Sequence, residues 1–217
     1  MPLALGLACL AFSGGGSLAH AEVLDSVVAS VGNIAITESD VEREYRVERF
    51  LDGEWPPPQA DGNTLKQVRE RLAYQKLLSL EEAAGRPESE ELEKAAAERL
   101  QNVRQRCDNE EQFQAALQAL GMNEPQLHEQ LVEQQRILQL IDQHLRPAAA
   151  PGPEEVKAYY RETFAPEYAR RNGRPAPPPG EVESQIRELL VQKRIDQLLA
   201  KWLEELMPSR RVRFHSF

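Results

Sequence analysis

Two short strand-forming segments at opposite ends of the chain constrain its fold more than any other feature. The run 23–31 is rich in β-branched residues, and the turn dipeptide Gly32-Asn33 and then Ile34-Ala35-Ile36 follow it, a pattern typical of a small hairpin. Residues 212–217 alternate like an edge strand. Because an isolated two-stranded hairpin is only marginally stable in water, we expect the C-terminal strand to return and pair with the N-terminal hairpin.

Helical patterns fill most of the chain between these strands. Thr37 and Asp40 have the spacing of a capping box, which predicts a helix over 38–51. Apolar side chains three or four positions apart, together with capping and stop residues, predict further helices over 63–84, 88–106, 110–120, 123–145, 154–170 and 181–206. Proline-rich linkers are expected at 146–153 and 173–180. The predicted fold is therefore mainly α, a multi-helix module with a small antiparallel β element.

The first 21 residues have the pattern of a cleavable export signal. An apolar run over 3–12 is followed by small residues and then by Ala19-His20-Ala21, which predicts cleavage after Ala21. About 20 apolar residues are needed to span a bilayer, so this run is too short for a transmembrane helix. The alternative, a buried N-terminal helix, is disfavoured by Gly14-Gly15-Gly16. We therefore expect a periplasmic protein with no stable membrane insertion.

Charge and cysteine content exclude several classes of protein. The chain carries a net charge of −9, and none of residues 1–21 is charged, so cleavage leaves this value unchanged. Such an acidic chain lacks the basic surface of a nucleic-acid-binding protein. Of the two cysteines only Cys107 survives cleavage, so no internal disulfide can form and stability must come from packing.

No pattern in the sequence predicts an active site. His128 and His144 are both expected on the helix over 123–145, but they are 16 positions apart, too far for two metal ligands on one helical turn. Cys107 continues an apolar stripe and is expected to be buried and inert. The chain has no glycine-rich phosphate loop, no HExxH and no Gly-x-Ser-x-Gly. We accordingly expect no catalytic residue, no metal and no cofactor.

Aromatic and large apolar side chains are the remaining candidates for a binding site. One group leads into a proline loop, a second lies between the two expected linkers, and Trp202 belongs to the unusually wide apolar arc of the last helix. Such side chains suit a groove for extended apolar peptides, although ordinary core packing is the alternative for each of them. The first group is Tyr45, Phe50, Leu51 and Trp55, and the second is Tyr159, Tyr160, Phe164 and Tyr168.

The segment 25–41, with the sequence DSVVASVGNIAITESDV, resembles the opening of the SurA-type periplasmic chaperones. Members of that family begin, directly after a signal peptide, with a hairpin of aliphatic residues and then Thr-x-x-Asp-Val at the start of a helix. Weaker resemblance continues to about Leu145, and 181–217 is similar to the returning helix and strand that complete the family's N-terminal module. The resemblance implies an N-terminal-type helical chaperone module over 22–145, completed by 181–217.

The chain departs from that family in the interval 146–180. Many relatives carry parvulin-type prolyl isomerase domains at this place, and such a domain needs on the order of 100 residues. The 35 residues present here are predicted to be a helix between linkers. The resemblance thus implies a chaperone module without the enzyme.

The expected function is that of an ATP-independent holdase that binds unfolded envelope or outer-membrane proteins through an apolar groove. Two alternatives stay open. One is a peptidyl-prolyl cis-trans isomerase-related protein, and the other is a dedicated structural partner in envelope assembly. The sequence also leaves open whether the protein is a monomer or a homodimer.

Overall fold

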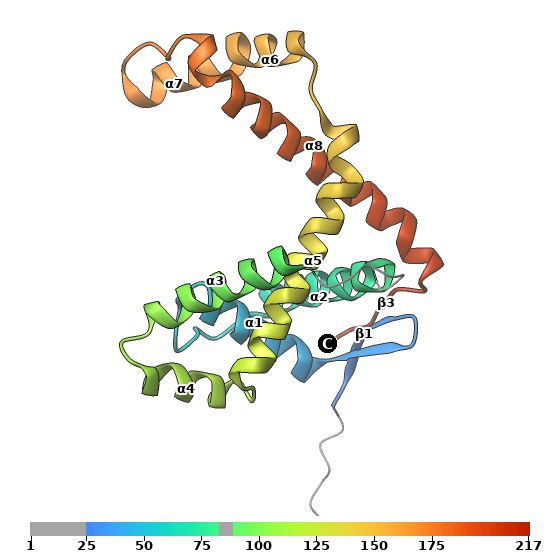
Figure 1. Ribbon diagram of the computed structural model, residues 1–217. Coiled ribbons are helices and arrows are strands. Elements are labelled where there is room, and N and C mark those ends of the chain that lie inside the picture. The colour runs from blue at the N-terminus through green and yellow to red at the C-terminus, as the bar shows by residue number, and fades with distance from the viewer. Residues whose placement is uncertain (1–24, 83–88) are drawn as a thin grey trace, which may run out of the picture.

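The computed structural model describes residues 25–82 and 89–217. The predicted signal peptide and its cleavage site at Ala19 and Ala21 lie outside these residues. The described chain is mainly α-helical with one small antiparallel sheet (Figure 1). This confirms the predicted fold class.

The sheet joins the two ends of the chain. Its strands are β1 (Val27–Val31), β2 (Ile34–Thr37) and β3 (Arg213–Phe214), in the order β2-β1-β3, and both pairings are antiparallel. The return of the C-terminal strand was predicted correctly. That strand is shorter than expected, although His215 extends the pairing with one further bond, from its N–H to the carbonyl oxygen of Val28 at 2.9 Å.

The hairpin leads directly into the first helix. Thr37 caps α1 (Glu38–Leu51): its hydroxyl accepts from the Asp40 N–H, and the Asp40 carboxylate accepts from the Thr37 N–H at 3.0 Å. Both bonds of a capping box are therefore present, as the sequence predicted. The helices that follow are α2 (Gly62–Glu82), α3 (Glu90–Arg106), α4 (Glu110–Ala119), α5 (Glu124–Ala149), α6 (Pro153–Tyr159), the π-helical turn η1 (Tyr160–Phe164), α7 (Ala165–Asn172) and α8 (Pro179–Ser209).

Three helices in the C-terminal half differ from the prediction. Helix α5 was expected to end at residue 145, but it continues to Ala149, because Leu145 and Ala149 are buried against α8. The single helix expected over 154–170 is instead α6, η1 and α7, interrupted by the π-helical turn. Helix α8 is longer than expected at both ends and includes Pro208 in its last turn.

The structure has three parts, which we call the main lobe, the arm and the tip (Figure 1). The main lobe comprises the sheet, α1 to α4, the first half of α5 and the end of α8, and it holds two large apolar clusters. In the arm, the second half of α5 packs on the middle of α8, with Val191 and Ile195 buried between them. The tip comprises α6, η1, α7 and the start of α8, and it lies at the far end of the arm from the sheet.

Candidate functional site

The first group of predicted peptide-binding residues belongs to the core of the main lobe. Tyr45, Phe50 and Leu51 are 8%, 3% and 5% exposed. The Tyr45 hydroxyl donates to the Pro58 carbonyl at 3.0 Å. The Trp55 ring packs edge-on against that of Phe50, with the two ring centroids 5.6 Å apart. The prediction of an open groove is therefore wrong for Tyr45, Phe50 and Leu51, because α1 turns these side chains toward the neighbouring helices. Trp55 is partly exposed at the edge of the same cluster.

The second group lies together at the tip. Tyr159, Tyr160 and Phe164 pack on a small cluster formed by Val156, Val182 and Ile186. The rings of Tyr160, Phe164 and Tyr168 follow one another, with centroids 5.9 and 5.8 Å apart. All four aromatic side chains remain partly exposed.

Polar contacts at their hydroxyl groups hold Tyr160 and Tyr168 in place. The Tyr160 hydroxyl donates to the Pro177 carbonyl at 2.8 Å, which fastens the proline-rich loop to η1. The Tyr168 hydroxyl accepts from the Arg174 guanidinium at 2.9 Å. The positions of these two rings are thus fixed by contacts within the tip.

Trp202 lies in neither group. It is partly buried where the arm meets the main lobe, and its ring stacks on His144 with centroids 4.2 Å apart. The nine predicted residues therefore fall in three separate places and do not form one groove.

A cleft that the sequence reasoning missed lies beside the sheet, between α1, α2 and α5. Its volume is about 500 Å³, within the usual range of ligand sites. Apolar side chains of Ile36, Leu72 and Ile137 line it together with charged groups and four glutamines, which are Gln75, Gln126, Gln130 and Gln134. The last three of these belong to α5 and follow one another at intervals of four positions, a spacing that places them on one face of the helix.

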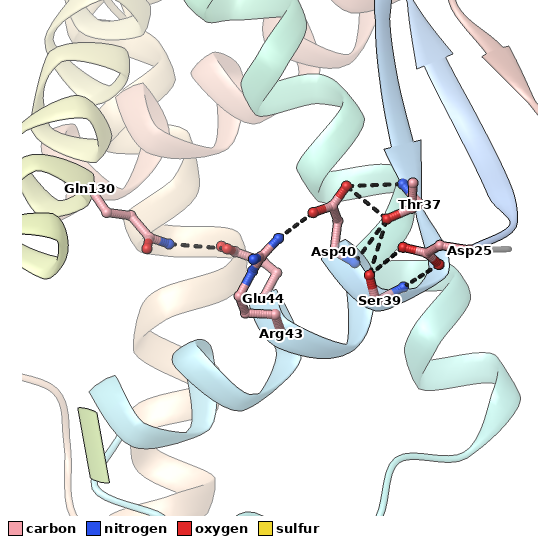
Figure 2. Close-up of polar contacts among 7 residues, drawn as sticks. All are labelled: Asp25, Thr37, Ser39, Asp40, Arg43, Glu44 and Gln130. Atoms are coloured by element: carbon pink, nitrogen blue, oxygen red, sulfur yellow. Dashed lines mark hydrogen bonds and ion pairs between the residues drawn. The ribbon is translucent and has the colours of Figure 1, made fainter. Parts of the chain in front are cut away.

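Glu44 on α1 is the buried ionisable group of this cleft. Its side chain is 8% exposed, and one oxygen accepts from the Gln130 amide at 3.0 Å (Figure 2). The other oxygen, Oε1, has no hydrogen-bond partner among the described residues. Burial raises the pKa of this carboxyl above its ordinary value, and the nearby Glu48 raises it further, whereas Gln130, Lys76 and Arg71 act in the opposite direction.

Several polar groups at the start of α1 are paired with one another. Arg43, the neighbour of Glu44, forms an ion pair with Asp40, the capping residue of α1. Ser39 binds Asp25 through its N–H at 3.2 Å and through its hydroxyl (Figure 2). Glu44 therefore stands out as the buried charge in this cleft whose second oxygen is unpaired.

We predict that Glu44→Gln stabilises the protein at pH 7 by on the order of 1 kcal/mol, since a neutral amide costs less to bury than an ionised carboxylate. A raised pKa means that the folded state holds this proton more tightly than the unfolded state. The contribution of Glu44 to stability therefore falls as pH rises from the ordinary carboxyl pKa through the raised one. The gain from the substitution should vanish below about pH 4, which urea unfolding across pH 3–8 measures. Glu129→Gln, an exposed carboxyl of the same cleft, is the control. A gain independent of pH would contradict this interpretation.

The histidines and the cysteine that the sequence analysis considered lie in separate places. The Nε2 atom of His128 lies 3.7 Å from a carboxylate oxygen of Glu93, and the His144 ring stacks on Trp202. Cys107 is partly buried, and burial raises the pKa of its thiol. Across residues 25–82 and 89–217, no three His, Cys, Asp or Glu side chains gather as metal ligands. In the same residues, no helix combines the length and apolar character needed to cross a membrane.

No protein-family model matches the chain, and no curated protein matches it.

Proposed function

We propose that this protein is an ATP-independent holdase that binds unfolded polypeptides in the periplasm, with outer-membrane proteins as its clients. The observation that carries the proposal is the tip, where Tyr159, Tyr160, Phe164 and Tyr168 stay partly exposed at the end of a helical arm. Aromatic faces held apart from the main core can contact apolar side chains of a client without unfolding the protein itself. The resemblance of 25–41 to the SurA-type chaperones supports the same function.

Weak, additive contacts would supply the affinity. Apolar burial contributes about 25 cal/mol per Å², so a few client side chains on the tip would bind in a readily reversible way. Release then needs no nucleotide, because the client leaves as it folds. The net charge of −9 favours solubility of a protein with such surfaces.

The test is the aggregation of an outer-membrane β-barrel protein diluted from urea, followed by light scattering. We expect the purified protein to suppress aggregation, and Phe164→Ala/Tyr168→Ala to weaken client binding about tenfold, equivalent to about 1.4 kcal/mol. Leu138→Ala removes an apolar side chain that is 58% exposed on α5, outside the tip, and it serves as the matched control. If the wild-type protein fails to slow aggregation, the holdase proposal is wrong.

The same preparation distinguishes the enzymatic alternative. A protease-coupled assay on a proline-containing peptide should give only the uncatalysed isomerisation rate. A rate that rises in proportion to the protein concentration would favour the isomerase-related alternative instead.

A further inference from the structure

The cleft beside the sheet follows the free edge of β2. This strand is the outer strand of the order β2-β1-β3, and both Ala35 and Ile36 line the cleft. Successive side chains of a strand point to opposite faces of the sheet. A cleft that contacts two successive residues therefore lies along the edge of the strand and not on one face.

The register shows which main-chain groups of β2 face this cleft. Gly32 donates its N–H to the Arg210 carbonyl at 2.8 Å, on the β3 side of β1, and Ser30 is two residues earlier. Main-chain groups two residues apart point to the same side of a strand, so those of Ser30 also face β3. Its partner on β2 is Ala35. The N–H and C=O of Ala35 consequently point away from β1, toward the cleft.

The next N–H of β2 that points away from β1 already has a hydrogen-bond partner. The Thr37 N–H donates to the Asp40 carboxylate at 3.0 Å, which closes the strand edge at the start of α1. The free edge thus offers one donor and one acceptor at Ala35, an exposed residue.

The opposite side of the cleft carries complementary polar groups. The amides of Gln75 on α2 and Gln134 on α5 make no hydrogen bond to the rest of the described chain. Each amide offers both a donor and an acceptor. Glu44 adds its unpaired, buried Oε1, which needs a donor. These groups match the alternating N–H and C=O groups on the second edge of an extended peptide.

We propose that this cleft binds an extended segment of an unfolded polypeptide as an added strand beside β2. One edge of the segment pairs with Ala35, and its other edge meets Gln75, Gln134 and Glu44. Alternate side chains of the segment face Ile36, Leu72 or Ile137. Recognition through the main chain tolerates many client sequences. The proposal rests on the function proposed above and names a site for the client's main chain, distinct from the aromatic tip.

The surroundings of β2 favour a single strand over a second copy of this protein. The free edge faces a cleft whose other walls are helices α1, α2 and α5. Pairing β2 with β2 of another copy would have to bring two such walled edges into contact. A single extended chain meets no such obstacle.

The test uses fluorescence anisotropy with a fluorescein-labelled ten-residue peptide of alternating valine and threonine. A second peptide has the same side chains but is N-methylated at alternate residues, which removes the donors along one edge. We expect the methylated peptide to bind at least about tenfold more weakly to the wild-type protein, the loss of a few hydrogen bonds. Equal binding of the two peptides would overturn the proposal.

Variants at one position separate the main chain from the side chain. Ala35→Pro removes the outward N–H and should weaken binding of the unmethylated peptide about tenfold. Ala35→Val keeps this N–H, so its affinity for the peptide should be within about twofold of wild type. Circular dichroism checks that the proline variant folds; if it does not, the methylated peptide on the wild-type protein decides. Gln75→Met/Gln134→Met should also weaken binding, with Gln118→Met, exposed on α4, as control.

The outcomes distinguish this proposal from the holdase function. In one outcome, the wild-type protein suppresses aggregation, and Ala35→Pro and Ala35→Val equal each other both in this activity and in peptide binding. The holdase proposal then stands, and the proposed peptide site beside β2 is wrong. If the peptide does not bind and Ala35→Pro instead abolishes self-association in sedimentation, the edge is a contact between copies, and the proposal is overturned. If no client is held at all, the holdase proposal itself fails.

Discussion

Ending the chain after Val212 is expected to lower the free energy of unfolding by about 3–5 kcal/mol, because it removes strand β3 together with most of the partners of a buried charge. That charge is Arg69 on α2, which is 8% exposed. Its guanidinium donates to the His215 carbonyl at 2.6 Å and lies 5.1 and 5.2 Å from the ring centres of Phe214 and Phe217. The truncation removes all three contacts and also strand β3.

A double-mutant cycle isolates the role of this charge. Arg69→Met should destabilise the full-length chain, but in the truncated chain it should be neutral or restore part of the stability, since the charge it removes has there lost its contacts with His215, Phe214 and Phe217 and keeps only Glu70 among the described residues. Urea unfolding of the four proteins measures the coupling. Additive effects would show that the truncation acts only through the loss of β3. Ser216→Ala, an exposed change in the same segment, should alter stability by less than about 0.5 kcal/mol.

Phe113→Ala is expected to lower the free energy of unfolding by about 3–5 kcal/mol, the usual effect of removing a large aromatic side chain from a core. Phe113 on α4 is fully buried in the second cluster of the main lobe. Its ring centre is 6.1 Å from that of Phe50, and the Arg104 guanidinium carbon lies 4.7 Å from the centre of the Phe113 ring. Its loss would leave a cavity between α1, α3 and α4.

Thermal and urea unfolding measure this effect. Gln114→Ala changes the next residue of α4, which is exposed, and should leave stability within about 0.5 kcal/mol of wild type. A loss of less than about 1 kcal/mol for Phe113→Ala would show that α4 contributes little to the cooperative core. That result would contradict the assignment of α4 to the main lobe.

Local patterns predicted most of the fold. The hairpin, its Gly32-Asn33 turn and the capping box at Thr37 and Asp40 follow from neighbouring residues, and α1 has the predicted bounds. The return of the C-terminal strand followed from the weakness of an isolated hairpin. Helix α5 beyond residue 145 could not be predicted in this way, because contacts with α8 extend it past Pro147.

The candidate sites were harder to predict. Tyr45 and Tyr159 both precede a proline-rich segment, yet one is core and the other is partly exposed at the tip. Periodicity shows which face of a helix is apolar but not what covers that face. The glutamine spacing on α5 was visible in the sequence, whereas the burial of Glu44 and its unpaired oxygen depend on the packing of α1 against α5.

The sequence by itself determined the mainly α fold, the hairpin and the need for a third strand, because each depends on local propensity or on the limited stability of two strands. Only the tertiary structure decided that the predicted aromatic residues divide among the main lobe, the arm and the tip. It also decided that the free edge of β2 faces a polar cleft. Both depend on how distant helices cross, and crossing is set by packing among residues far apart in the chain, which no local pattern records.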